Sequence, residues 1–253
     1  MLKEKKDAKE YLRQAINVNN LFENDENYVI SQLNKIDRFA NADAVLAKAM
    51  DKGYTKVVEM LLTDERADPT VEDNYAIWWA AKNGYAKVVK ILLNDKRVNP
   101  SVYDNWVIGE AAENGHDKVV ELLLKDERIN PAAEDNYAIK YAAENGHTKV
   151  VELLLKDERV NPAAEDNHAI KYAAENGHDK VVEMLLKDER VDPTTEDNYA
   201  LKWATAYGHD KVVELLLKDK RVDPSKCGNY AILAELNGHD KAGKMLEEAI
   251  QKR

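Results

Sequence analysis

A spacing of 31 residues runs through most of this 253-residue chain and limits what it can fold into. The segments 135–165 and 166–196 differ at only six of their 31 positions. Repetition at such a period predicts a stack of similar units, each burying its apolar face against the next. Function is then expected on the surface of the stack rather than in one central cleft. The chain's six prolines all keep the spacing: Pro69, Pro100, Pro131, Pro162, Pro193 and Pro224.

Each unit is expected to contain two helices, as the fourth unit illustrates. Asp135 and Asn136 are suited to cap a first helix over 137–145. Gly146 would end that helix, because glycine readily adopts the left-handed conformation found after a helix terminus. A second helix is expected over 148–156, whose Val-Val and Leu-Leu-Leu runs are too apolar to be exposed all round.

The repeat divides the chain into a helical N-terminal cap at 1–41, six copies of the unit, and a degenerate capping copy at 228–253. Terminal units of such stacks are atypical because their outer faces must be wet. The cap is expected to hold two helices, on the helical spacing of Ala8, Tyr11, Leu12, Ala15, Ile16 and of Tyr28, Val29, Leu33, Ile36, Phe39. The six copies are 42–72, 73–103, 104–134, 135–165, 166–196 and 197–227.

Composition excludes several classes of function. The net charge of −10 argues against binding nucleic acid, which requires clustered Lys and Arg, and against anionic membrane surfaces. No apolar run approaches the roughly 18 residues of a membrane span. Cys227 is the only cysteine, so an internal disulfide is impossible and a reducing, intracellular location is expected, which we take as cytoplasmic.

The segment AIKYAAENGHTKVVELLL at 138–155 resembles the ankyrin-repeat pattern TPLHxAAxxGHxxVVxLLL. The resemblance covers about 42–250 and implies an all-α, ankyrin-type helical-repeat solenoid of about seven units, with short connectors or fingers. It also implies a concave surface of first helices and finger tips that binds protein. Two departures matter. Thr-Pro-Leu-His is replaced by Tyr-Ala-Ile-Lys at 137–140, and the period is 31 rather than 33, so the finger should be shorter.

Most polar residues that recur from copy to copy are interpreted as residues that stabilise the stack rather than as functional sites. Five of the six histidines follow the repeat glycine, and copies about 10 Å apart cannot share a metal ion, so no metal site is expected. The connector arginines, from Arg66 to Arg221, are expected to tie neighbouring connectors together through their acids. Cys227 lacks a partner histidine and is not interpreted as a nucleophile. No phosphate loop or catalytic motif appears, so we expect no enzyme activity and no cofactor.

Copy-specific residues are the better candidates for recognition, because nothing in the repeat requires them. Copies two and three carry Trp78 in place of lysine, Tyr103 in place of glutamate, and Gly109-Glu110 in place of Lys-Tyr. Exposed Trp and Tyr are enriched in binding hot spots. Trp78 could instead pack on the N-terminal cap. The candidate partner-binding residues are Trp78, Tyr103, Trp106, Glu110, Tyr207 and a positive stripe of Lys140, Lys171 and Lys202.

These observations favour a non-catalytic protein–protein interaction module, expected to be a monomer that binds a partner protein on its first-helix and finger face. One alternative is an engineered or consensus-like scaffold without a natural partner, which the 25 identities between copies four and five would suit. Another is an effector that recruits a host target, since the DxRVxP…DNYA pattern resembles arrays of protists, giant viruses and some bacterial effectors. A third is an active site on residues 1–41, which contain neither His nor Cys.

Overall fold

The computed structural model describes residues 18–35 and 41–252. Every regular element in these ranges is a helix, so the prediction of an all-α fold is confirmed. The chain divides into two compact units, Met1–Val102 and Tyr103–Arg253. The first of the two expected cap helices, at 8–16, lies outside the described residues, as do Ile36 and Phe39.

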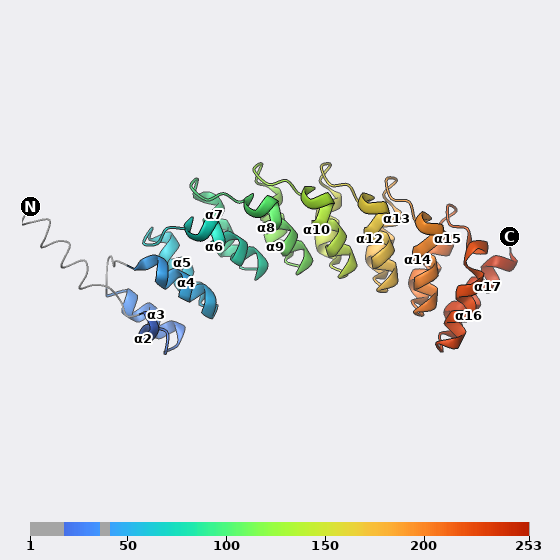
Figure 1. Cartoon of the computed structure of the whole chain (residues 1–253), viewed down its shortest axis with the longest axis horizontal. Helices are drawn as coiled ribbons and strands as arrows, with labels where there is room; N and C mark the ends of the chain where they lie inside the picture. The colour runs from blue at the N-terminus through green and yellow to red at the C-terminus, as the bar shows by residue number, and fades with distance from the viewer. Residues whose placement is uncertain (1–17, 36–40, 253) are drawn as a thin grey trace, which may run out of the picture. The chain divides into compact units, whose positions relative to one another are not determined.

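The first unit contains helices that pack in pairs (Figure 1). Val29 and Leu33 are fully buried, as their helical spacing predicted. The helices are α2 (Val18–Leu21), α3 (Glu26–Leu33), α4 (Ala42–Lys52), α5 (Thr55–Thr63), α6 (Val71–Lys82) and α7 (Ala86–Asn94).

The second unit repeats one helix pair per copy, and from α10 onward each first helix packs on the first helix of the next copy (Figure 1). A short 3₁₀ helix precedes the last pair. The elements are α8 (Val102–Glu113), α9 (Asp117–Leu124), α10 (Ala133–Glu144), α11 (Thr148–Leu155), α12 (Ala164–Glu175), α13 (Asp179–Leu186), α14 (Thr195–Ala206), α15 (Asp210–Lys218), η1 (Pro224–Cys227), α16 (Gly228–Leu236) and α17 (Asp240–Gln251).

The two helices of copy four end close to the predicted positions. α10 stops at Glu144, and Gly146 follows with a φ of +73°. The N–H groups of Gly146 and His147 donate to the carbonyls of Ala143 and Ala142. These bonds satisfy carbonyls that the end of the helix leaves without partners. The chain then reverses directly into α11, and the short turn holds the two helices of a copy against each other.

The residues predicted to cap α10 form a left-handed turn instead. Glu134, Asp135 and Asn136 adopt left-handed conformations, with φ values of 50°, 52° and 64°. Right-handed helix geometry begins only at Tyr137, and no side-chain cap bond is made at the start of α10. The Asn136 Oδ1 instead accepts the N–H of Asn161, 25 residues later, at 2.6 Å. The predicted N-cap is therefore wrong, and this left-handed turn links one connector to the next.

The core follows the repeat. Val150, Val151 and Leu154 of α11 are buried to 1% exposure or less, and so are Ala142 and Ala143 of α10. The small alanines allow first helices to approach closely, while the second helices supply the apolar volume. Pro162 is also buried, so the connector packs onto the stack as well. Adjacent copies thus share one continuous core within the unit.

The connector arginines bridge copies through the backbone. Arg159 forms a two-point ion pair with Asp157 of its own connector, with an Nη2–Oδ2 distance of 2.6 Å. Its Nη1 donates to the carbonyl of Ile129 in the preceding copy. Arg190 repeats both contacts with Asp188 and the Val160 carbonyl. The expectation that acids tie neighbouring connectors together is corrected: the acid orients the arginine, and the carbonyl makes the link.

The last copy differs from the others on α16. Ile232 and Leu236 are 57% and 79% exposed, while Ala242 and Gly243 of α17 are buried. α16 therefore keeps apolar side chains on its surface, although the outer face of a terminal unit is expected to be wet.

Candidate functional site

A column of aromatic rings runs along the first helices of the second unit, and most of its members are half-buried. Each ring contacts the next at centroid distances between 4.1 and 6.0 Å, close to the preferred range for aromatic pairs. The column places large, partly exposed apolar surfaces at a regular spacing across several copies. In order, its rings are Trp106, Tyr137, Tyr141, His168, Tyr172, Tyr199 and Trp203.

Every second ring of the column is fixed to the preceding copy by a carboxylate. The Tyr137 hydroxyl donates to Glu113, and the Tyr199 hydroxyl donates to Glu175. Burial, and then the hydrogen bond to Glu113 and its negative charge, raises the pKa of Tyr137, so its hydroxyl stays protonated. His168 replaces the repeat tyrosine and keeps the link, with Nε2 3.0 Å from a Glu144 carboxylate oxygen. The substitution at 168 therefore preserves the contact between copies.

Trp106 and Glu110 form a pair that belongs to copy three alone. The Trp106 Nε1 donates to Glu110 at 2.9 Å, and its ring contacts Tyr137 at 4.6 Å. Glu110 is only 8% exposed. Tyr137 also packs against Gly109, so closely that an added Cβ would lie 3.0 Å from the ring. The bulk lost at Gly109-Glu110 thus lets the two rings meet over the helix.

Two of the predicted stripe lysines are buried and form ion pairs with exposed carboxylates. Lys140 is 4% exposed and Lys171 is 7% exposed. Their Nζ atoms lie 2.8 and 2.6 Å from the carboxylates of Glu165 and Glu196 respectively. The expectation of a stripe of free positive charge is therefore wrong at these positions, because each lysine is neutralised by the following left-handed turn. A role for these residues in partner binding stays a prediction.

The remaining candidates of the second unit are more accessible. Lys202 is half-buried, with its Nζ 5.9 Å from the ring centroid of Tyr230. Tyr207 is 44% exposed and stacks on Trp203 at 5.4 Å. Tyr103 is 50% exposed and occupies the first position of a left-handed turn. These side chains can contact a partner without rearrangement of the fold.

Trp78 lies in the first unit, on α6. Its ring is half-buried, 5.4 Å from Tyr75, and the Nζ of Lys82 lies 4.9 Å from its centroid. These neighbours belong to the same helix, which is an arrangement typical of a surface tryptophan. The ring and cation–π contacts of Trp78 among the described residues thus lie within α6.

Comparison with known proteins identifies the repeat. A family model described as "Ankyrin repeats (3 copies)" matches residues 46–135, 108–197 and 163–228, which together make up well over half of the chain. The chain belongs to the ankyrin-repeat family. A crystal structure of an ankyrin repeat family protein from Legionella pneumophila is similar, with 19% identity and a TM-score of 0.43. That match covers 82% of this chain and 79% of the other. No curated protein matches the chain.

Ankyrin repeats are in general protein–protein interaction modules. In this chain, three of the histidines that follow a repeat glycine join neighbouring ankyrin repeats. The Nε2 atoms of His147, His178 and His209 lie 2.8–2.9 Å from the carbonyl oxygens of Glu113, Glu144 and Glu175. Each ring also sits directly over the glycine of the preceding repeat. The structural interpretation of these histidines is supported by direct contacts.

The thiol of Cys227, the single cysteine of the chain, is buried. Burial raises the pKa of the Cys227 thiol to about 11, which leaves it a poor nucleophile. Within residues 18–35 and 41–252, no group of three or more His, Cys, Asp or Glu is placed to hold a metal ion. No helix in that part of the chain is long and apolar enough to cross a membrane.

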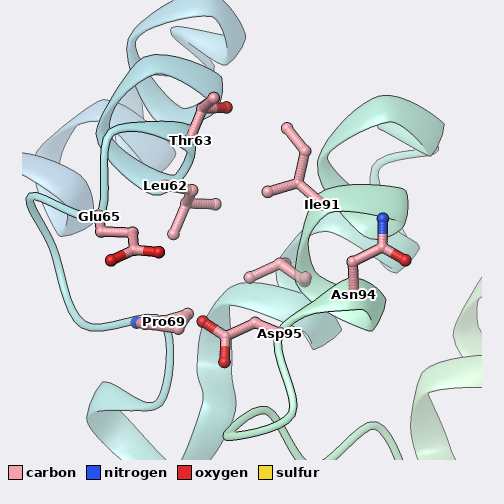
Figure 2. Close-up of a pocket in the computed structure, with 8 residues that line it drawn as sticks. Leu62, Thr63, Glu65, Pro69, Ile91, Asn94 and Asp95 are labelled. Carbon is pink, nitrogen blue, oxygen red and sulfur yellow. The ribbon is translucent and has the colours of Figure 1, made fainter.

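A groove in the first unit was not predicted from the sequence. It has a volume of about 290 Å³ and lies between α5 and α7, with Leu62 and Ile91 on opposite sides and Pro69 and Asp95 at one end (Figure 2). The sequence feature that could have indicated this groove is the residue that follows the leucine run of each second helix. Copies three to six have lysine there, whereas Thr63 and Asn94 are shorter and leave the groove open.

Proposed function

We propose that this ankyrin-repeat protein is a non-catalytic protein-binding module, whose partner lies against the first helices and left-handed turns of the second unit. The ring column carries the proposal. Half-buried Tyr and Trp side chains supply large contact area at low cost in conformational entropy, and they dominate binding hot spots. Tyr103 and Trp106 at one end, and Tyr207 at the other, are the proposed anchors. Trp78 is a separate proposed anchor on the first unit.

The dimensions of this face suit a macromolecule. A stable protein interface buries about 800 Å² on each partner, which requires contact with several copies. The cavity beside Trp106 has a volume of only about 10 Å³, too small to enclose a metabolite. A wide face without a deep pocket favours a protein surface as the ligand.

The charged groups of this face also support binding without catalysis. Lys140 and Lys171 are held in ion pairs, and the Tyr137 and Tyr199 hydroxyls donate to carboxylates. A general acid or base must be able to exchange its proton with a substrate. These lysines and tyrosines are held by fixed partners, and their contacts stabilise the stack of repeats instead.

The test is affinity capture from a cytosolic extract, followed by purification of the retained protein and calorimetric measurement of its Kd. Wild type would be run beside Tyr103→Ala, Trp106→Ala and Trp78→Ala, with circular dichroism confirming equal folding. Tyr28→Ala is the matched control, because Tyr28 is 44% exposed on α3, outside the proposed face.

We expect loss of an anchor to weaken binding by about 2 kcal/mol, or about thirtyfold, and the control to bind as wild type does. Equal binding by all variants would place the interface elsewhere. Absence of any specific partner would favour a scaffold without one.

A further inference from the structure

The second unit contains a recurring site for a lysine ammonium, which we term the lysine slot. In copy four, Lys140 reaches across to the Glu165 carboxylate at the start of the next left-handed turn. In copy five, Lys171 reaches Glu196 and lies 5.8 Å from the Tyr199 ring centroid. The slot therefore consists of the turn carboxylate that ends one copy and the ring near the start of the next copy, and a lysine from the first helix of the former copy fills it.

In copy three the walls of the slot are present but its lysine is missing. Gly109 stands where Lys140 and Lys171 stand in the next two copies. The corresponding carboxylate is Glu134, and the corresponding ring is Tyr137. The Glu134 side chain is exposed and forms no hydrogen bond or ion pair with any other residue that the structure describes. Its counterpart Glu165 is occupied by Lys140.

The space at this slot matches a small cation. A cavity of about 10 Å³ is lined by Trp106, Gly109, Glu134 and Tyr137, among others. That volume is about what one water-sized group requires, and an ammonium is such a group. Two aromatic rings beside a carboxylate provide both charge pairing and cation–π attraction.

The local charge balance also favours a cation. Glu110 and Glu113 lie next to the same rings, since Trp106 donates to Glu110 and Tyr137 donates to Glu113. In copies four and five the counterparts of Glu113 are glutamates, whereas the counterparts of Glu110 are tyrosines and a lysine stands at the position of Gly109. Copy three therefore carries one more carboxylate and one fewer lysine at these positions than its neighbours. A ligand that brings one positive charge would reduce this excess of negative charge.

We propose that the slot at Gly109 binds the ammonium of a lysine side chain from the partner protein, held by the Glu134 carboxylate against Tyr137 and Trp106. This inference rests on the proposed function, and it specifies one contact of that interface. Lysine fits better than arginine, because the chain's own slots hold ammonium groups and a planar guanidinium is wider than this cavity.

The test uses nuclear magnetic resonance with a defined probe, Nα-acetyl-lysine N-methylamide, titrated into the full chain. The Trp106 indole N–H and the Tyr137 ring report on the slot. The norleucine analogue of the probe has the same aliphatic stem without the ammonium. Glu134→Gln removes the proposed carboxylate, and Glu165→Gln is the matched control, because that carboxylate is already occupied.

We expect the lysine probe to shift both signals in a saturable way and the norleucine probe to leave them in place. Glu134→Gln should weaken the response by at least about fivefold, and Glu165→Gln should leave it unchanged. Equal responses to the two probes, or an unaffected Glu134→Gln, would overturn the proposal. This titration needs no partner protein. If the lysine probe fails to bind while a partner is still captured, only the lysine slot is refuted. If the probe binds but no partner is captured, the slot is supported and the proposed function is not.

Discussion

Gly146 and Gly238 end the first helices of copies four and seven with similar left-handed conformations, at φ values of +73° and +81°. Alanine at either position incurs the same backbone cost, about 1–2 kcal/mol. Their surroundings differ. A Cβ on Gly146 would lie 2.5 Å from His178 Nδ1, whereas no atom of the described residues lies within 4 Å of one on Gly238. Comparing the two alanine variants therefore isolates the contact between copies.

The additional cost at Gly146 can be estimated from what His178 would lose. A separation of 2.5 Å forces the ring to move, and its Nε2 bond to the Glu144 carbonyl, 2.9 Å long, would break. Leaving a partly buried donor and acceptor unpaired costs about 1–3 kcal/mol. We expect Gly146→Ala to lower the free energy of unfolding by about 2–5 kcal/mol in total, and Gly238→Ala by about 1–2 kcal/mol.

The measurement is urea unfolding followed by far-ultraviolet circular dichroism. Because repeat arrays can unfold in parts, hydrogen exchange of the amides around copies four and five should accompany it. A double-mutant cycle sharpens the test. His178→Ala should destabilise the wild type by about 1–3 kcal/mol, but should cost little in the Gly146→Ala background, where the ring has already been displaced.

Equal destabilisation by Gly146→Ala and Gly238→Ala would refute this reasoning, because the backbone conformation alone would then account for the effect. Additivity in the cycle would refute it as well, since it would show that the ring and the added methyl group do not interact.

Three further predictions follow from partly or fully buried groups of the second unit. The hydrogen bonds from Arg159 lower the pKa of Asp157 in the folded protein. The pair therefore stabilises the fold fully at a pH above the unfolded-state pKa of aspartate, about 3.9, and this contribution is lost as the pH falls through the lower folded-state pKa. Asp157→Asn should flatten that part of the profile of stability against pH. His168→Tyr should change the free energy of unfolding by less than about 1 kcal/mol at neutral pH, because tyrosine makes the equivalent carboxylate bond in neighbouring copies, whereas His168→Ala should cost clearly more in the same urea titration. Cys227 is fully buried, with its pKa raised to about 11, so Ellman's reagent at pH 8 should modify the native protein far more slowly than the urea-unfolded chain; equal rates would contradict this burial.

Helix positions could be predicted from the sequence because the signals that set them are local. Gly146 ends α10 through its own backbone freedom, and the apolar run of α11 must be buried in any folded state. The 31-residue spacing then extended these assignments to the other copies. For the same reason the copy-specific aromatic residues can be recognised from the sequence alone.

The turn before α10 could not be predicted in this way. Asp-Asn ahead of an apolar helix is a sound N-cap signal, yet Asn136 bonds to Asn161 in the next connector. A partner 25 residues away outweighed the local one, because stacking brings that N–H within reach of the side chain.

The sequence by itself thus determined the repeat, its helices and the positions at which copies differ. Tertiary structure decided which of those differences are accessible. The sequence predicts Lys140 as free charge, because its partner Glu165 lies 25 residues further along the chain, at the start of the next left-handed turn. Only the stacking of one copy on another shows that this lysine is paired, and that the Glu134 carboxylate of the copy before it is not paired within the described chain. Burial and ion pairing depend on which surfaces meet, and that information appears only when the copies are packed together.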